Sequence, residues 1–288
     1  MTQLQKSANI DYSRVNQYWN NARPSIMGPY MMDGFGFPAS AGRFRFCAEK
    51  AIVQQLIKGI NCDGTVLDLG CGIGYWTEYF AQNFQKVIAI ESSSPLYAAL
   101  KQQCLPYSNV ETIHANVEKF EPEESYKLVF LGGMLMYLNE NDVTILLRKI
   151  IPSLEPGAIV LCRETTVRKG VVTRRGEYQA VYRSVQTYEN IFRKCGFDVI
   201  SVQKNEPYIL MQMGCELIKK WKSILPGPLQ LVPIAGHFVY WGLRLGNPWV
   251  MHIAKKLGID FPELENHFFV LRVSNRTSLN KQTDFASS

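Results

Sequence analysis

Several common signals are missing from this chain of 288 residues. Its seven cysteines form no CxxC pair and no CxxxH spacing, which argues against a metal site and against a disulfide framework. The start, MTQLQKSANIDYS, lacks the basic and apolar regions of a secretory signal. No apolar run is long and unbroken enough to span a membrane. We therefore expect a cytoplasmic protein without a bound metal.

A strong excess of one charge is also missing. The formal net charge is +6, and the basic residues are scattered rather than gathered into a nucleic-acid-binding stripe. The tightest basic group, Arg168, Lys169, Arg174 and Arg175, is interpreted as a solvated loop. The four histidines lie far apart in the sequence and are interpreted as structural residues. A nucleic-acid partner is therefore not expected.

Apolar runs alternate with helical periodicity from residue 65 to residue 204, which predicts a doubly wound α/β fold with a mostly parallel sheet. The predicted strands are Val66–Leu69, Val87–Ile90, Val110–His114, Leu128–Leu131, Ile159–Cys162, Asp198–Val202 and His267–Val273. The predicted helices are Tyr75–Asn83, Pro95–Gln103, Asn141–Ile151 and Ser184–Cys195, with another near Cys47–Gly59. Leu154–Ala158 (LEPGA) is predicted as a turn. In such folds the ligand lies at the carboxyl ends of the central strands.

The stretch VLDLGCGIG, which ends at Gly74, places three glycines directly after the first predicted strand. Backbone N–H groups in such a turn can approach a ligand closely because glycine has no Cβ. Glu91 ends the next strand, where an acidic side chain can accept hydrogen bonds from ribose hydroxyls. The dinucleotide pattern GxGxxG would need a third glycine at Tyr75. That bulky side chain argues against NAD and FAD.

The order DLGCGIG resembles motif I of the class I S-adenosylmethionine (SAM)-dependent methyltransferases. YKLVFLGGMLMYL resembles the fourth strand of that family and the loop beyond it, and LEPGAIVLCRE resembles its fifth strand. The resemblance implies a Rossmann-like sheet of seven strands with the last one antiparallel, and S-adenosylhomocysteine (SAH) as a product. It implies cofactor contacts from Tyr18, Asp68, Gly70, Gly72, Gly74, Glu91, Ser92, Asn116, Val117, Leu131 and Gly132. Many members carry Asp where this chain has Asn116.

Outside this core the chain divides into further parts. Residues 1–43 are predicted to form an N-terminal cap, in which Gly28–Pro38 is either a lid over the cofactor or a packed arm. Residues 44–204 plus 267–275 are the predicted SAM-binding domain, and residues 276–288 a disordered tail. Residues 205–266 are predicted to be a helical insertion. The insertion covers the acceptor site, forms a homodimer interface, or makes a peripheral membrane contact.

Candidate acceptor residues lie near the fifth strand and in the cap. Arg163 and Glu164 follow that strand, and Glu164 is the best candidate for a base or for an orienting group, with a salt bridge between loops as the alternative. Tyr182 is a second catalytic candidate. Trp19, Tyr178 and Arg183 are candidate substrate contacts, although Tyr178 and Tyr182 can equally pack on the sheet edge.

The Tyr18–Trp19 pair and the glycine-rich segment after it are partly similar to the protein α-N-methyltransferase branch. That branch has an Asp-Asn pair where this chain has Arg163 and Glu164.

The sequence therefore predicts a SAM-dependent N- or O-methyltransferase that acts without metal on a small or medium-sized, apolar or aromatic acceptor. A peptide or protein N-methyltransferase is the alternative among enzymes, and a catalytically silent methyltransferase-like scaffold is the alternative outside them. A nucleic-acid methyltransferase is disfavoured because GGML stands where such enzymes carry an NPPY-like tetrapeptide.

Overall fold

The computed structural model describes residues 4–5, 9–24, 39–224, 241–242, 245–246, 249, 256 and 262–274. The chain divides into two compact units. One unit comprises residues 1–22, 57–203 and 267–288, and the other comprises residues 23–56 and 204–266. The predicted lid at Gly28–Pro38, most of the insertion after residue 224 and the predicted tail lie outside the described residues.

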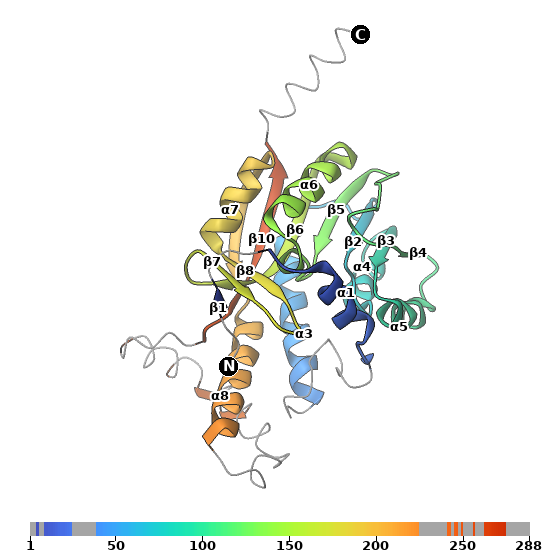
Figure 1. The fold of residues 1–288 in the computed structure, drawn as a ribbon. Helices are drawn as coiled ribbons and strands as arrows, with labels where there is room; N and C mark the ends of the chain where they lie inside the picture. The colour runs from blue at the N-terminus through green and yellow to red at the C-terminus, as the bar shows by residue number, and fades with distance from the viewer. Residues whose placement is uncertain are drawn as a thin grey trace. The chain divides into compact units, whose positions relative to one another are not determined.

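Seven strands make the sheet that the sequence predicts. Their order across the sheet is β4-β3-β2-β5-β6-β10-β9, and the five strands from β4 to β6 run parallel (Figure 1). The strands are β2 (Thr65–Leu69), β3 (Lys86–Glu91), β4 (Val110–His114), β5 (Tyr126–Leu131), β6 (Leu154–Val167), β9 (Phe197–Lys204) and β10 (Glu265–Val273).

The last strand runs antiparallel to its neighbours. At one end of the β9–β10 pair, the Ser274 N–H donates to the Gly196 carbonyl just before β9. At the other end, the Asn205 N–H donates to the Asn266 carbonyl near the start of β10. The predicted α/β fold with an antiparallel last strand is therefore confirmed.

The helices between these strands also match the predictions to within a few residues. They are α4 (Tyr75–Ala81), α5 (Ser94–Cys104), α6 (Glu140–Ile150) and α7 (Val185–Lys194). Ser184 caps α7, since its Oγ accepts a hydrogen bond of 3.2 Å from the Thr187 N–H. Gly196 follows that helix with a positive φ of 94°, as expected for a C-terminal glycine.

The core lies between the sheet and the helices α6 and α7. The apolar face of α6 is buried through Val143, Leu146, Leu147 and Ile150, as its periodicity predicts. On α7, the Tyr188 ring stacks on Phe192 and contacts Phe269 of β10. All three aromatic side chains are completely buried, so they anchor the sheet that positions the site.

The fifth predicted strand is longer than expected and begins earlier. The prediction of a turn at Leu154–Ala158 is wrong, because these residues form the first part of β6. Tyr126 of β5 pairs with Leu154, and the register then shifts so that Leu128 pairs with Ile159. An irregular strand pairing therefore replaces the turn, with Gly157 at a positive φ of 78°.

Four elements at the edge of the sheet are not in the predictions. A hairpin of β7 (Val171–Arg174) and β8 (Ala180–Ser184) extends β6, with Thr166 paired to Arg183. The short β1 (Leu4–Gln5) pairs with β7, and α1 (Tyr12–Asn20) follows β1 in the chain. The solvated-loop interpretation is wrong for Arg174, which ends β7.

The second unit contains two long helices, α3 (Ala39–Leu56) and α8 (Glu206–Ile224). The Asn205 side-chain amide donates 2.7 Å to Glu49 Oε1 and 2.8 Å to Asn266 Oδ1. Arg45 lies 3.6 Å from the same Glu49 carboxylate. These buried polar contacts hold α3 against the start of α8.

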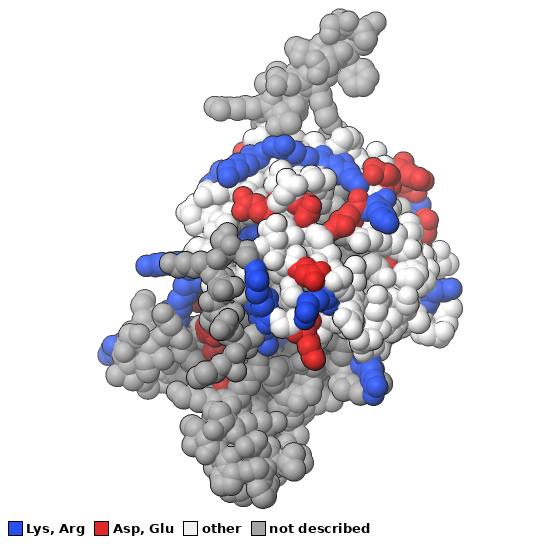
Figure 2. Space-filling view, in the orientation of Figure 1, with Lys and Arg blue, Asp and Glu red and all other residues white. Residues whose placement is uncertain are grey.

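Charged side chains are mixed on the face drawn in Figure 2, where Lys and Arg alternate with Asp and Glu among uncharged residues. Among the described residues, no helix is both long and apolar enough to cross a membrane.

Candidate functional site

The glycine turn after β2 is built from three residues with positive φ: Gly70 at 66°, Gly72 at 61° and Gly74 at 90°. A Cβ on Gly70 would lie 2.7 Å from Met134 Cγ, and one on Gly74 would lie 2.7 Å from Leu100 Cδ1. A Cβ on Gly72 would meet no atom within 4 Å. The positive φ favours glycine at all three positions. A Cβ would also crowd a side chain at the two outer positions, whereas Gly72 borders open space.

Glu91, the last residue of β3, connects this turn to the loop before α5. Its Oε2 accepts a hydrogen bond of 2.9 Å from the Gly72 N–H, and its Oε1 accepts one of 2.7 Å from the Ser93 N–H. The side chain is only 6% exposed, and burial raises the pKa of its carboxyl although both N–H groups oppose the shift. Each oxygen keeps a second lone pair, so the carboxylate can also accept bonds from ligand hydroxyls.

Asp68 lies buried in β2, two residues before the turn. The Thr77 hydroxyl donates 2.7 Å to its Oδ2, whereas its buried Oδ1 has no hydrogen-bond partner within the part of the chain that the structure describes. Burial, together with the nearby Glu91 charge, raises the pKa of Asp68 to about 7. A buried oxygen without a donor indicates a place for a polar ligand group.

The remaining predicted cofactor residues follow the neighbouring strands. Ser92 is exposed beside Glu91, and Leu131 ends β5 just before Gly132. Val117 is buried in the core. Asn116 Oδ1 accepts a local hydrogen bond of 3.1 Å from the Glu118 N–H. All of these residues lie at or just after the carboxyl ends of parallel strands. The predictions place the ligand at this edge of the sheet.

His114 is a neighbour of this edge to which the sequence predictions assign no binding role. Its ring stacks on Tyr97 with centroids 4.7 Å apart, and its Nε2 lies 3.0 Å from the Ser92 carbonyl oxygen. The sequence feature that could have pointed to His114 is its place as a polar residue at the end of the third predicted strand.

Helix α1 brings Tyr18 and Trp19 to the same edge. The Ser93 hydroxyl donates 2.7 Å to the Trp19 carbonyl, and the Ser94 N–H donates 3.3 Å to Asn20 Oδ1. The C-terminal end of α1 is therefore bound to the loop that begins with Glu91.

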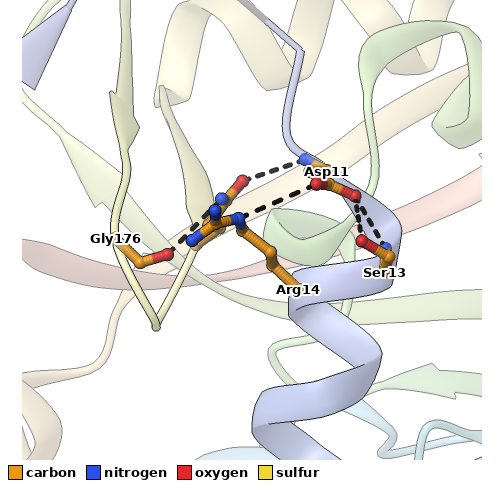
Figure 3. Close-up of polar contacts among 5 residues, drawn as sticks. Asp11, Ser13, Arg14 and Gly176 are labelled. Carbon is orange, nitrogen blue, oxygen red and sulfur yellow. Dashed lines mark hydrogen bonds and ion pairs between the residues drawn. The ribbon is translucent and has the colours of Figure 1, made fainter.

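The other end of α1 is fixed by side chains far away in sequence. Figure 3 shows Asp11 capping the helix: its carboxylate accepts bonds from Ser13, and its N–H donates 2.9 Å to Gln179 Oε1. The Ile10 N–H donates 2.9 Å to Asn139 Oδ1, and the Tyr12 hydroxyl donates to Asp142. The helix is thus held at both ends.

Four aromatic rings meet beside α1, and we call Tyr18, Trp19, Tyr137 and Tyr178 the aromatic box. The ring centroids of Tyr18–Trp19, Trp19–Tyr137, Tyr137–Tyr178 and Tyr178–Tyr18 lie 5.2, 5.3, 5.9 and 5.1 Å apart. Each ring is steeply inclined to the next, at 72° to 89°. The contacts close a cycle, and all four side chains are half-buried. Tyr137 is the member that the sequence reasoning missed.

Hydroxyl groups converge on Tyr178 as well. The Tyr137 and Tyr178 oxygens lie 3.0 Å apart, and the Tyr182 hydroxyl donates 3.4 Å to Tyr178. Burial and the neighbouring tyrosines raise the pKa of Tyr178 above its usual range, so this phenol stays neutral at physiological pH.

Glu164 and Arg183 both bind the backbone of the short turn η2 (Leu135–Tyr137). Arg183 also binds the residue that follows this turn. Glu164 Oε1 accepts 2.9 Å from the Leu135 N–H. Arg183 donates 3.0 Å to the Leu135 carbonyl and 2.6 Å to the Leu138 carbonyl. Both side chains are almost completely buried inside the fold. Their contacts fix the turn that carries Tyr137.

Burial raises the pKa of Glu164 to about 7, although Arg163 and Arg183 oppose the shift. An acid with a raised pKa in the folded state stabilises the fold fully below its unfolded pKa and loses that contribution as pH rises through 7. From Glu164 alone we expect roughly 2 kcal/mol more stability at pH 5.5 than at pH 8. Urea denaturation of wild type and Glu164→Gln at both pH values tests this. An unchanged pH difference in the variant would contradict it.

Together, the sheet order, the glycine turn and the acid that ends the second strand are typical of α/β domains that bind a nucleoside-containing ligand at the carboxyl edge of their strands. Residues 66–157 match the family model described as "Methyltransferase domain". The chain thus contains a class I SAM-dependent methyltransferase domain.

Three similar proteins illustrate the range of this likeness. Phosphoethanolamine N-methyltransferase 3 of Arabidopsis thaliana is 27% identical over 157 residues, which cover 54% of this chain and 31% of that protein. Alpha N-terminal protein methyltransferase 1 of Drosophila melanogaster is 21% identical over 206 residues, covering 68% and 71%. The structure of a SAM-dependent methyltransferase from Leishmania major superposes with a TM-score of 0.58 at 14% identity, covering 91% of this chain and 82% of that one.

The structural likeness shows the fold alone. The chain spans less than two thirds of the length of the first relatives that it matches, from 27% to 60%. The domain is therefore known, and the acceptor has to be argued from the site.

Proposed function

We propose that this protein transfers the methyl group of SAM to nitrogen or oxygen of a small-molecule acceptor and releases SAH. The observation that carries this proposal is the Glu91 carboxylate, which is bonded to the Gly72 N–H beside open space. This arrangement provides acceptors for two ribose hydroxyls next to a turn that a methionine tail can approach.

The other cofactor contacts follow from the same edge of the sheet. Asp68 Oδ1 is a buried acceptor suited to the ammonium group of the methionine part, directly or through water. Asn116 and Val117 are proposed to flank the adenine, and Leu131 and Gly132 to lie near the sulfonium. Ser92 and Tyr18 are proposed to border the bound cofactor, because both belong to the segments that join α1 to the Glu91 loop.

Acceptor contacts are proposed from Trp19, Tyr178, Tyr182 and Arg163, which surround or adjoin the loop after β5. A Cβ on Gly133 would lie 3.8 Å from Arg163 Nη2, so this guanidinium is close to the loop backbone. Glu164 and Arg183 hold η2 from inside the fold. We therefore propose that both are positioning residues rather than groups that touch the acceptor.

Methyl transfer from a sulfonium is an in-line displacement at a carbon that is already activated. The protein has to align the acceptor atom, the methyl group and the sulfur, and to exclude water from them. The half-buried aromatic box beside the Glu91 loop supplies an apolar wall for this purpose. A small acceptor with an apolar part fits such a wall.

We further propose that residues 44–204 and 267–275 form the cofactor-binding domain. For residues 205–266 we retain the three alternatives of a cover, an interface between copies, and a membrane contact. Lys204 and Glu265 form an ion pair of 3.1 Å that joins the two ends of this segment.

A peptide acceptor is the second candidate, because the alpha N-terminal protein methyltransferase of Drosophila melanogaster matches over 71% of its length. An acidic groove for a peptide amine would support it. The Glu91 and Glu164 carboxylates are instead buried and bonded to backbone N–H groups. A catalytically silent scaffold is disfavoured by the intact glycine turn.

A transfer assay with SAM labelled on its methyl group tests the proposal. We expect label in small amines or phenols, with SAH formed in equal amount, and no label in short peptides with free amino termini. Glu91→Ala serves as the negative control. Label in the peptides alone would favour the second candidate. Neither labelled acceptor nor SAH across both panels would contradict the proposed function.

A further inference from the structure

We propose that the acceptor is an amine and that its nitrogen is methylated against the aromatic box of Tyr18, Trp19, Tyr137 and Tyr178. This inference rests on the proposed function, because it concerns the acceptor of the same methyl transfer. It narrows the choice between nitrogen and oxygen on the basis of where positive charge develops during the reaction.

The aromatic box differs from the aromatic cluster that fills the core beside α7. Tyr188, Phe192 and Phe269 are completely buried and fill the core. The four residues of the box are all half-buried, and they form a closed cycle of edge-to-face contacts.

Polar contacts hold three walls of the box in place. Tyr137 is carried by η2, which Glu164 and Arg183 hold through the Leu135 backbone. Trp19 is held through its carbonyl by Ser93, and Tyr178 through its hydroxyl by Tyr137 and Tyr182. Such support of accessible side chains by a buried second layer is typical of a preorganised binding site.

The box lies next to the proposed methyl donor. Ser93, which holds Trp19, is two residues after Glu91 and gives its N–H to that carboxylate. Tyr137 follows the Gly132–Gly133 loop that is proposed to border the sulfonium. The walls of the box are therefore connected on two sides to elements of the cofactor site.

The movement of positive charge during the reaction explains why such a box favours a nitrogen acceptor. A neutral amine, which has lost its ammonium proton to water, attacks the methyl carbon with its lone pair. The C–N bond forms, the C–S bond breaks, and its electron pair returns to sulfur. The positive charge thus moves from sulfur to the acceptor nitrogen. Aromatic faces stabilise a cation held against them, and that stabilisation grows as the charge arrives.

An oxygen acceptor does not need a site that stabilises a positive charge. A phenolate becomes a neutral ether when it is methylated, so no cation develops on the acceptor. The Arg174 guanidinium carbon already lies 5.0 Å from the centre of the Tyr178 ring, so the acceptor nitrogen is proposed to lie against the other rings of the box.

The test uses choline, a trimethylammonium probe, and its neutral isostere 3,3-dimethylbutan-1-ol. Both are titrated into the full chain saturated with SAH. We expect choline to bind at least about tenfold more tightly than the alcohol, since cation–π contacts act only on the charged probe. Tyr137→Leu, which keeps an apolar side chain but removes the ring, should lose about tenfold in choline affinity. Tyr137→Phe should keep most of it.

Tyr107→Leu is the matched control, because Tyr107 is another half-buried tyrosine and lies near α4, in contact with Glu78. We expect it to leave choline affinity unchanged. Equal affinity for choline and the alcohol would overturn the amine inference, and so would an unchanged choline affinity in Tyr137→Leu. If the chain still bound SAH in those experiments, the proposed function would remain intact. A chain that failed to bind SAH would instead refute the proposed function, and the inference with it.

Discussion

Replacing Glu91 by Ala should weaken SAM binding by at least about tenfold and up to about a thousandfold. Each hydrogen bond to a charged group contributes roughly 1.5 to 3 kcal/mol, and about 1.4 kcal/mol corresponds to a factor of ten. The carboxylate is expected to serve the ribose hydroxyls, and it also holds the Gly72 and Ser93 N–H groups. Isothermal titration calorimetry of wild type and variant measures the change.

Two further variants separate this role from a general effect of charge. Glu91→Gln retains one acceptor oxygen and should fall between wild type and Glu91→Ala. Glu111→Ala removes an exposed carboxylate from the neighbouring strand β4, where it pairs with Lys86 at 3.4 Å, and should leave SAM affinity unchanged. A wild-type dissociation constant in Glu91→Ala would refute the ribose role.

Arg183→Leu should destabilise the fold by about 3 to 5 kcal/mol, the range found when one partner of a buried charged contact is removed. The substitution removes the side-chain donor from the Leu135 and Leu138 carbonyls, and the Leu135 carbonyl keeps the bond from the Leu138 N–H. It also takes away a cation that faces Glu164 and the Tyr188 ring. Urea denaturation gives the change in the free energy of unfolding.

Arg193→Leu is the control, because it makes the same substitution at a surface position. Arg193 pairs with Glu189 at 3.2 Å on the outer face of α7. Such a surface pair contributes at most about 1 kcal/mol to the free energy of unfolding. A destabilisation below about 1 kcal/mol in Arg183→Leu would show that η2 does not depend on this side chain.

The central sheet was predictable because most of its strands can be recognised from local sequence patterns. The strands β2, β3 and β5 are short apolar runs that are almost completely buried, so they can be recognised without knowledge of distant partners. The strand β4 is partly exposed and gives a weaker signal. The glycine turn and Glu91 are separated by one helix and one strand, and right-handed βαβ connections place their ends together. That part of the site could therefore be predicted from spacing.

The acceptor side was not predictable in the same way. The box joins α1 to η2 and to the segment before β8, both of which lie more than 100 residues after α1 in sequence. Nothing local in MLMYL indicates that Tyr137 faces Trp19. Likewise, Arg163 and Glu164 were expected just beyond the fifth strand, but that strand continues to Val167. Glu164 therefore points into the fold, where it binds the Leu135 N–H.

The fold itself does not select the acceptor. The relatives that this chain matches include enzymes named for phosphoethanolamine and for protein amino termini. The family model matches residues 66–157, which leave out α1 and the segment before β8. Specificity therefore has to be tested at the aromatic box and not inferred from the sheet.

Calorimetric titration of the wild-type chain with SAM tests the central claim most directly. We expect a single site with a dissociation constant in the micromolar range, and no heat of binding with NAD, because Tyr75 takes the place of the third dinucleotide glycine. Absence of SAM binding at millimolar concentration would contradict the assignment of Gly72 and Glu91 as the cofactor site.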